Sequence, residues 1–123
     1  RLPAYAHSLG RALLAQLPPQ RLAEHLPAGT RARHSQHTVT ERKALNAELA
    51  LARQRGWSFA NSELVAGLFG VAIEIPSCTG EARFGLNVSS IGQPWSVSHI
   101  ERHIVPALRA CAQRLQMLTD TLG

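Results

Sequence analysis

The stretch LFGVAIEIPSCTGEARFGLNVSS, residues 68–90, decides the fold. Its first part, residues 68–76, alternates between two kinds of side chain, and so does its last part, residues 83–90, as β-strands do. The SCTGEA segment between them, which contains Thr79 and Gly80, is typical of a tight turn. We therefore predict an antiparallel hairpin, and the WSFAN run at residues 57–61 is a further short strand candidate.

Splitting the two strands by side-chain direction gives a bulky face and a small face. The bulky face carries Phe69, Val71, Ile73, Ile75, Phe84, Leu86 and Val88. The small face carries Leu68, Gly70, Ala72, Glu74, Gly85, Asn87 and Ser89. We expect the bulky face to pack on helices, with Phe69, Val71, Leu86 and Val88 in the core. The small face leaves volume and offers hydroxyl and amide groups, as a polar-ligand pocket requires, although an ordinary solvated sheet face is the alternative.

Two helices and a loop are predicted at the start of the chain. Residues 8–17 have Ser8 as a candidate N-cap and leucines at helical spacing, and two prolines then end the helix. A short helix follows at residues 20–26. Residues 27–39 are rich in turn formers and charge, without an apolar period, so they form a surface loop.

A third helix runs from a cap at Thr40 to Arg55, with Gly56 just past its end. Its buried stripe consists of Leu45, Leu49 and Ala52. Three helices followed by strands and a last helix indicate an α+β fold, an α/β sandwich in which helices flank a mostly antiparallel sheet.

The last helix is long and covers residues 97–118. Ser98 and Glu101 have the spacing of a capping box, and Pro106 should bend the helix because it removes one backbone hydrogen bond. The predicted buried stripe is Ile100, Ile104, Leu108, Cys111, Leu115 and Leu118.

Composition limits the classes of protein. The chain has 123 residues, 45% of them hydrophobic, which is enough for one domain with its own core. No apolar run approaches the roughly 20 residues that cross a bilayer, so we expect a soluble protein without a membrane partner. The 13 Lys and Arg against 8 Asp and Glu give a net charge of +5, but the arginines are scattered, which argues against nucleic-acid binding by this segment. Cys78 and Cys111 fit no metal or redox spacing, so we expect free thiols in a reducing cytoplasm.

Few residues suggest chemistry by themselves. Ser8 opens a helix whose N-terminal amides could hold an anion, or it simply caps that helix. His99 and His103 lie one turn apart without a third ligand at suitable spacing, so we expect surface histidines and no metal. Cys78 lies at a turn without an identifiable base, so a free thiol is expected there. Since GXSXG, P-loop and GXGXXG motifs are absent from the sequence, we predict no enzyme and no cofactor.

Four blocks of the sequence carry a family resemblance. In chain order they are LPAYAHSLGRALLAQLP, TVTERKALNAELALARQRGWSFANSELVAGLFGVAIEIP, FGLNVSS and HIVPALRACAQRL. Together they resemble the effector-binding domain of IclR-type bacterial transcription regulators over nearly the whole chain. LNVS and IVPALRACA look closest to the branch that controls aromatic-acid catabolism, such as protocatechuate or 4-hydroxybenzoate regulators.

The resemblance implies a GAF-like domain that binds a small organic acid, which this branch suggests is aromatic. It also implies that residues 1–123 are part of that domain, without its opening helix and strands. A winged helix-turn-helix that binds DNA as a dimer would precede them, in a cytoplasmic homodimer or tetramer. Carried over by motif, the effector contacts fall on Ser8, Leu9, Leu68, Gly70, Asn87 and Ser89. The alternative is an oligomerisation module without a functional pocket.

Three positions depart from the family pattern. Ala60 stands where many relatives have an acidic residue, so a polar contact is lost there. Gly70 replaces a common Cys or Ser, and its missing side chain should enlarge the pocket in favour of a ring. Tyr5 stands where a His is usual. These departures predict an effector that differs from those of close relatives.

Overall fold

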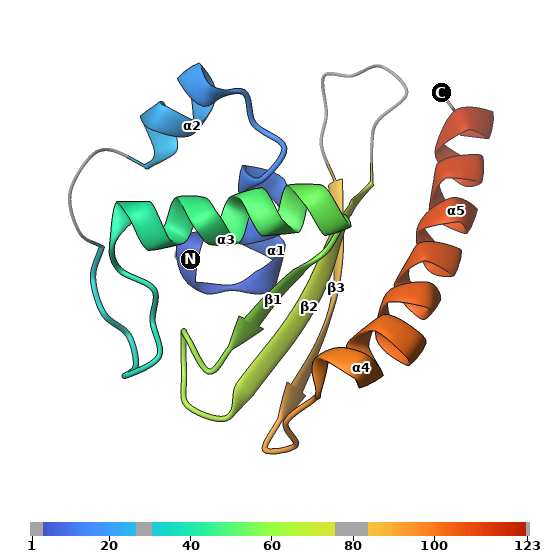
Figure 1. The fold of residues 1–123 in the computed structure, drawn as a ribbon. Helices are drawn as coiled ribbons and strands as arrows, with labels where there is room; N and C mark the ends of the chain where they lie inside the picture. Colours follow the sequence, from blue (N-terminus) through green and yellow to red (C-terminus); the bar gives the residue numbers. More distant parts are fainter. Residues whose placement is uncertain (1–3, 27–30, 76–83, 123) are drawn as a thin grey trace.

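A computed structural model describes residues 4–26, 31–75 and 84–122 of the chain (Figure 1). In chain order the elements are a 3-10 helix (Ala4–Ala6), α1 (Ser8–Leu14), α2 (Pro19–His25), α3 (Arg42–Arg55), β1 (Ser58–Asn61), β2 (Leu68–Ile75), β3 (Phe84–Ile91), α4 (Val97–His99), a π-helical segment (Ile100–Ile104) and α5 (Val105–Leu122). Helix α1, with α3 beside it, packs on one face of the sheet, and α5 packs on the other. The α+β prediction is therefore confirmed.

The three strands form an antiparallel sheet in the order β1-β2-β3. In the register of the sheet, Gly70 on β2 lies between Ala60 on β1 and Ser89 on β3. Directly opposed residues share a face, so the small face continues across all three strands. The predicted turn with Thr79 and Gly80 lies outside the described residues.

The larger core lies between the bulky face and α5. Its buried members are Trp57, Val71, Ile73, Ile75, Ile100, Val105, Leu108 and Ala112. Of the predicted sheet core, Phe69 and Val71 are buried and Leu86 is partly buried, but Val88 is 36% exposed. The expectation for Val88 is wrong because β3 is an edge strand and α5 packs mainly over β2.

The second core lies among α1, α2 and α3, on the side of the small face. Its buried members are Leu14, Ala15, Leu26, Leu45, Leu49 and Ala52. This confirms the stripe predicted for α3. Gly56 ends α3 with φ +87°, a left-handed conformation that glycine adopts without steric cost.

The first two predicted N-caps are displaced by one residue. Helix α1 is capped by His7, whose Nδ1 accepts the Gly10 N–H at 3.1 Å, so Ser8 is the first helical residue instead of the cap. Helix α3 has Glu41 at its N-cap, where Thr40 was expected. Helix ends depend on single dihedral angles, and the residue types at neighbouring positions do not fix them.

The predicted capping box of the last helix is also wrong. Ser96 is the N-cap of α4, and its Oγ accepts the His99 N–H at 3.0 Å. The helix therefore begins two residues earlier than a cap at Ser98 would allow, and Glu101 lies beyond the first turn that Ser96 closes. Positions 96 and 98 are both serine, and the spacing to Glu101 wrongly favoured Ser98 as the cap.

Between α4 and α5 the helix takes a π-helical turn, where Figure 1 shows its direction changing. The Val105 N–H donates to the carbonyl of Ile100, five residues back. Pro106 follows directly and has no N–H to donate, so the interruption predicted at Pro106 falls at this turn.

The π-helical turn changes which side of α5 is buried. One extra residue in a turn rotates everything after it by about 100°. The buried positions of α5 are therefore Val105, Leu108 and Ala112. Of the predicted stripe, Cys111, Leu115 and Leu118 are exposed, which corrects the expectation for this half of the helix.

Candidate ligand-binding site

A cavity of about 240 Å³ lies over the small face of the sheet, beside the start of α1. Its lining residues are His7, Ser8, Leu9, Ala60, Leu64, Leu68, Gly70, Asn87 and Ser89. The six residues to which the resemblance assigns effector contacts are thus brought together around one cavity. Pockets for drug-sized ligands measure roughly 300–1,000 Å³, so this cavity suits a smaller molecule.

The polar groups of the cavity come from two sides. Ser8 on α1 is 3% exposed, whereas Asn87 and Ser89 on β3 are exposed, and the Asn87 amide donates to Ser89 Oγ at 3.4 Å. The cavity is therefore closed under α1 and open along the edge strand. Among the described residues that line it, none is Lys or Arg. An anion would be held by hydrogen-bond donors instead of a fixed cationic side chain.

His7 is a lining residue that the sequence did not reveal. Its Nδ1 accepts the Gly10 N–H, so in the neutral ring the proton lies on Nε2. Histidine is not among the preferred N-cap residues, which is why the cap was assigned to Ser8. Ala60 also lines the cavity as a buried apolar residue, in agreement with the expected loss of a polar contact there.

Gly70 brings α1 close to the sheet. A methyl group at Gly70 would lie 2.6 Å from Ser8 Oγ and 3.3 Å from Ser8 Cβ. Both contacts are shorter than van der Waals packing allows. The glycine therefore admits the Ser8 side chain to the small face, and the enlarged pocket expected from its missing side chain stays a prediction.

We expect Gly70→Ala to lower the free energy of unfolding by about 1–3 kcal/mol, the usual cost of overpacking. Since Ser8 Oγ is the nearest atom, the double variant Gly70→Ala/Ser8→Ala should lose less than the sum of the two single variants. Urea unfolding of all four proteins measures this coupling. Strictly additive losses would contradict a direct contact between the two positions.

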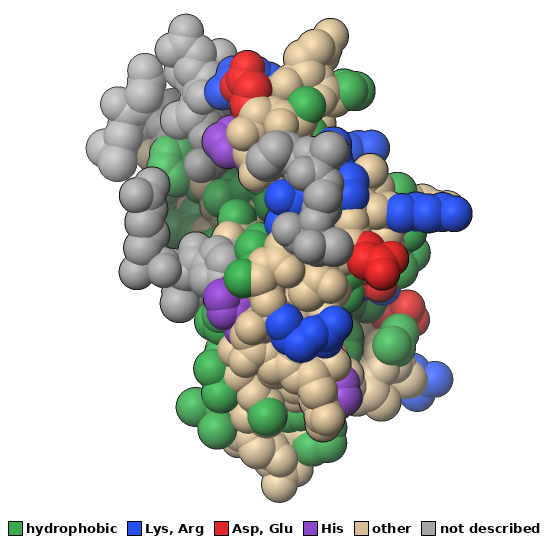
Figure 2. Space-filling model, turned by 90° about the vertical axis from the view of Figure 1, so that its left-hand side faces the viewer, with side chains coloured by type: hydrophobic (Ala, Val, Ile, Leu, Met, Phe, Trp, Pro, Cys, Tyr) green, Lys and Arg blue, Asp and Glu red, His purple; other side chains and the backbone are tan. Residues whose placement is uncertain are grey.

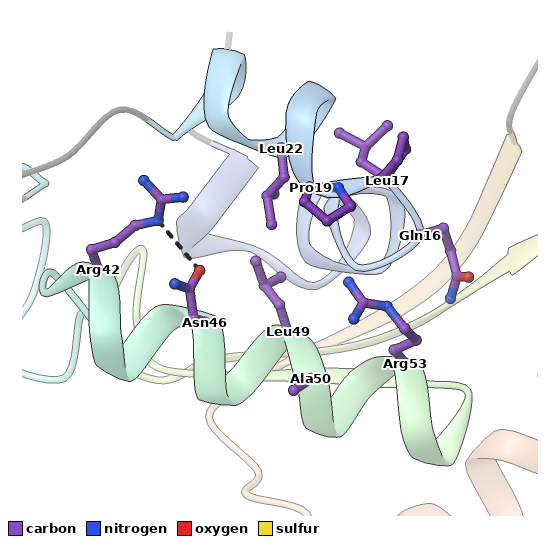
Figure 3. Close-up of a pocket in the computed structure, with 10 residues that line it drawn as sticks. Gln16, Leu17, Pro19, Leu22, Arg42, Asn46, Leu49, Ala50 and Arg53 are labelled. Carbon is purple, nitrogen blue, oxygen red and sulfur yellow. Dashed lines mark hydrogen bonds between the residues drawn. The ribbon is translucent and has the colours of Figure 1, made fainter.

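A larger hollow of about 530 Å³ lies between α2 and α3 (Figure 3). Arg42 and Arg53 reach into it from α3, and both already make hydrogen bonds within the protein. The guanidinium of Arg42 donates to Asn46 Oδ1 at 3.3 Å and to the carbonyl of Leu26, and Arg53 Nε donates to the carbonyl of Ala15 at 2.6 Å. None of the predicted site residues lines this hollow. We therefore place the candidate site in the smaller cavity.

The other reactive side chains of the described residues form no further site. The rings of His99 and His103 are exposed, with centroids 5.1 Å apart. In residues 4–26, 31–75 and 84–122, no three His, Cys, Asp or Glu residues are grouped to hold a metal. Cys111 is an exposed free thiol, and Cys78 lies outside the described residues. Burial lowers the pKa of Arg55, which is not among the residues that line the cavity.

Two properties of the described residues, their surface charge and the apolarity of their helices, concern nucleic acids and membranes as partners. On the face that Figure 2 presents, the Lys and Arg side chains form separate patches instead of one continuous block. This agrees with the scattered arginines of the sequence. No helix of the described residues combines the length and apolarity needed to pass through a membrane.

An antiparallel sheet between helices, with a cavity under a helix start, defines an α+β domain with space for a small molecule. The chain belongs to the family described as bacterial transcriptional regulator IclR C-terminal, whose family model matches residues 1–117. It is 32% identical over 115 residues to the Pca regulon regulatory protein of Pseudomonas putida. That match covers 94% of this chain and 40% of the relative, so the chain spans less than half of that protein.

Solved structures support the same assignment. A candidate transcriptional regulator of Rhodococcus sp. RHA1 matches 98% of this chain with a TM-score of 0.88 and 33% identity, over 49% of its own length. A double mutant of the PobR inducer-binding domain of Acinetobacter, in complex with 3-hydroxybenzoic acid, matches 94% of this chain (TM-score 0.84, 25% identity, 66% of that domain). An IclR homologue of Microbacterium hydrocarbonoxydans, in complex with 4-hydroxybenzoate, matches 98% (TM-score 0.81, 29% identity, 48% of that chain). The matching proteins are regulators and not enzymes, as the sequence predicted.

Proposed function

We propose that this chain senses a small aromatic acid, which binds in the small-face cavity. The observation that supports this best is the convergence of α1, β2 and β3 on one cavity through the six residues expected to contact an effector. Two similar proteins, a double mutant of the PobR domain and the Microbacterium homologue, were crystallised with 3- and 4-hydroxybenzoate respectively. A one-ring acid also suits a cavity of about 240 Å³.

The lining divides into polar and apolar parts that match such a ligand. We assign hydrogen bonds with the carboxylate and ring hydroxyl to Ser8, Asn87 and Ser89, and ring contacts to Leu9 and Leu68. Hydrogen bonds to a charged group contribute about 1.5–3 kcal/mol each, so those made to the carboxylate can hold it without a cationic partner. No metal or cofactor enters this proposal.

In the complete protein, effector binding would change DNA binding. The chain spans 40% of the Pseudomonas relative, and we propose that the rest of the regulator includes the opening part of this domain and a winged helix-turn-helix. The protein would act on DNA in the cytoplasm as a homodimer or tetramer. An effector that binds one arrangement of the domains better than the other shifts their equilibrium by that difference in affinity.

Isothermal titration of the purified chain with 3- and 4-hydroxybenzoate, within a broad panel of organic acids, tests the site. At a ligand concentration of 100 times Kd, the bound acid should stabilise the chain by about 2.7 kcal/mol, visible as a rise in Tm. Ser8→Leu and Asn87→Leu should abolish both signals because each fills the cavity and removes a hydrogen-bonding group.

Val88→Leu is the matched control for Asn87→Leu. Val88 is the next residue on β3 and points to the bulky face, so its substitution should leave binding unchanged. A folded wild-type chain that binds no acid of the panel would refute the sensor proposal. If Asn87→Leu and Val88→Leu weaken acid binding equally, the effect does not arise in the cavity.

A second function, an interaction module without a ligand, has one observation in its favour. Leu115, Met117 and Leu118 of α5 are 39%, 69% and 59% exposed, which leaves apolar surface on this helix uncovered. Sedimentation of the wild-type chain and of Leu115→Glu/Leu118→Glu measures the assembled mass. A mass that falls only in the α5 variant, together with no response to any acid, would favour the module over the sensor.

A further inference from the structure

A buried ion pair ties α1 to the connection between β1 and β2. Arg11 Nη1 donates to Glu63 Oε2 at 2.6 Å, and Arg11 Nη2 donates to Glu63 Oε1. The two side chains are 2% and 7% exposed. Each charge is compensated by the other at hydrogen-bond distance, and neither side chain is open to solvent, so the pair holds its geometry closely.

Both side chains also hold backbone groups in place. Arg11 Nε donates to the carbonyl of Tyr5 at 2.8 Å, and Nη1 also lies 3.4 Å from the carbonyl of Phe59. Glu63 Oε1 accepts the Val39 N–H at 3.2 Å. The ion pair therefore joins α1 and the segment before it, strand β1, and the surface loop before α3.

The anchored segments are the walls of the small-face cavity. Glu63 and Phe59 directly precede the lining residues Leu64 and Ala60, and Arg11 lies three residues after Ser8 on α1. Residues three apart on a helix share a face, so the Arg11 side chain leaves α1 on the side where Ser8 meets the sheet. Neither Arg11 nor Glu63 lines the cavity itself.

We propose that Arg11 and Glu63 are positioning residues of the effector site. Their ion pair sets the separation of the α1 wall, with Ser8, from the wall at Leu64, and thereby determines which isomer of a substituted aromatic acid fits. This inference rests on the proposed function. Binding groups must be held within about 0.5 Å to discriminate between ligands, and a bidentate ion pair is a stiff enough support for that.

The test needs a measurement that a loss of stability alone does not change. If a variant only reduces the folded fraction, it weakens the apparent affinity for every ligand by the same factor. The ratio of the Kd values for 3-hydroxybenzoate and 4-hydroxybenzoate then stays constant. A shifted wall changes this ratio, because the two isomers place the same hydroxyl at different points of the cavity.

The double variant Arg11→Met/Glu63→Leu removes both charges, and apolar replacement of a whole buried pair is often tolerated. We expect it to fold and to change the ratio of the two Kd values by about tenfold, the effect of one misplaced hydrogen bond. If the double variant does not fold, Arg11→Lys takes its place, since it keeps the charge but loses the planar fork, and it should change the ratio in the same direction.

Two controls isolate the ion pair. Leu45→Ala destabilises the core beside α1 and keeps both charges of the Arg11–Glu63 pair, and Glu24→Leu removes an exposed pair with Arg21. Both should leave the ratio of the two Kd values unchanged. A wild-type ratio in the Arg11 and Glu63 variants would overturn the positioning role while leaving the sensor intact. A folded wild-type chain that binds no acid of the panel, these two isomers included, would overturn both proposals.

Discussion

Replacing Glu63 with leucine is expected to lower the free energy of unfolding by about 3–5 kcal/mol, because the substitution leaves a buried guanidinium without its counter-charge. Arg11 is 1% exposed, so water cannot take over the role of the carboxylate. The Val39 N–H loses its acceptor as well, which acts in the same direction. Domains of this size are stable by about 5–15 kcal/mol, so the variant should lie near the limit of folding. Urea unfolding measures the loss.

The exposed pair of Arg21 and Glu24 provides the matched control. Its N–O distance is 3.6 Å, and its side chains are 62% and 68% exposed, so Glu24→Leu should cost less than about 1 kcal/mol. The double variant Arg11→Met/Glu63→Leu should be more stable than Glu63→Leu alone, since it removes the unpaired charge. If Glu63→Leu costs no more than Glu24→Leu, the pair is open to water in solution and its assigned role is wrong.

This ion pair could not be predicted from the sequence. Arg11 and Glu63 are 52 residues apart, and local patterns assign a charged residue to the surface unless a partner is known. The apolar period of α1 contains no sign that its arginine points inward. Only the packing of α1 against the end of β1 brings the two charges together, and that packing is a property of the whole fold.

The faces of the sheet, in contrast, followed from the sequence alone. A strand has a fixed two-residue period, so one correct assignment, such as Gly70 to the small face, fixes every other position on the strand. The register then places Asn87 and Ser89 on the same face by strict alternation. Alternation therefore explains why Leu68, Gly70, Asn87 and Ser89 line one cavity. Ser8 and Leu9 lie on α1 and were assigned by the family resemblance, whereas His7 and Leu64, which also lie outside the strands, were missed.

Helix α5 shows where periodicity reaches its limit. A stripe of buried residues can be extrapolated only while the helix keeps 3.6 residues per turn, and the π-helical turn before Pro106 adds one residue. Leu108 is buried as predicted, but Ala112 is buried in place of Cys111. The proline indicates that the helix is irregular at this point. It does not indicate whether the helix only bends or whether its buried face also moves to other positions.

Gly10→Ala is expected to destabilise the chain by about 3 kcal/mol, although the same substitution inside an unobstructed helix stabilises it by roughly 0.5–1 kcal/mol. A methyl group at Gly10 would lie 2.5 Å from the Cα of Ala4 and overlap its carbonyl oxygen. Both atoms belong to the backbone and cannot turn aside. The 3-10 helix would have to separate from α1, so Tm should fall by roughly 10 °C. Differential scanning calorimetry measures the change.

Gly85→Ala provides the comparison, because its new methyl group meets a movable side chain. The nearest atom there is Leu9 Cδ1, at the tip of a flexible residue, and the nearest backbone atom is the carbonyl oxygen of Ile73 at 3.5 Å. Leu9 can rotate, so the loss of stability should stay below about 1.5 kcal/mol. Leu9 also lines the cavity, so Gly85→Ala should weaken acid binding even though its Tm stays close to that of the wild-type chain. An unchanged or raised Tm for Gly10→Ala would show that Ala4 and α1 are not in contact.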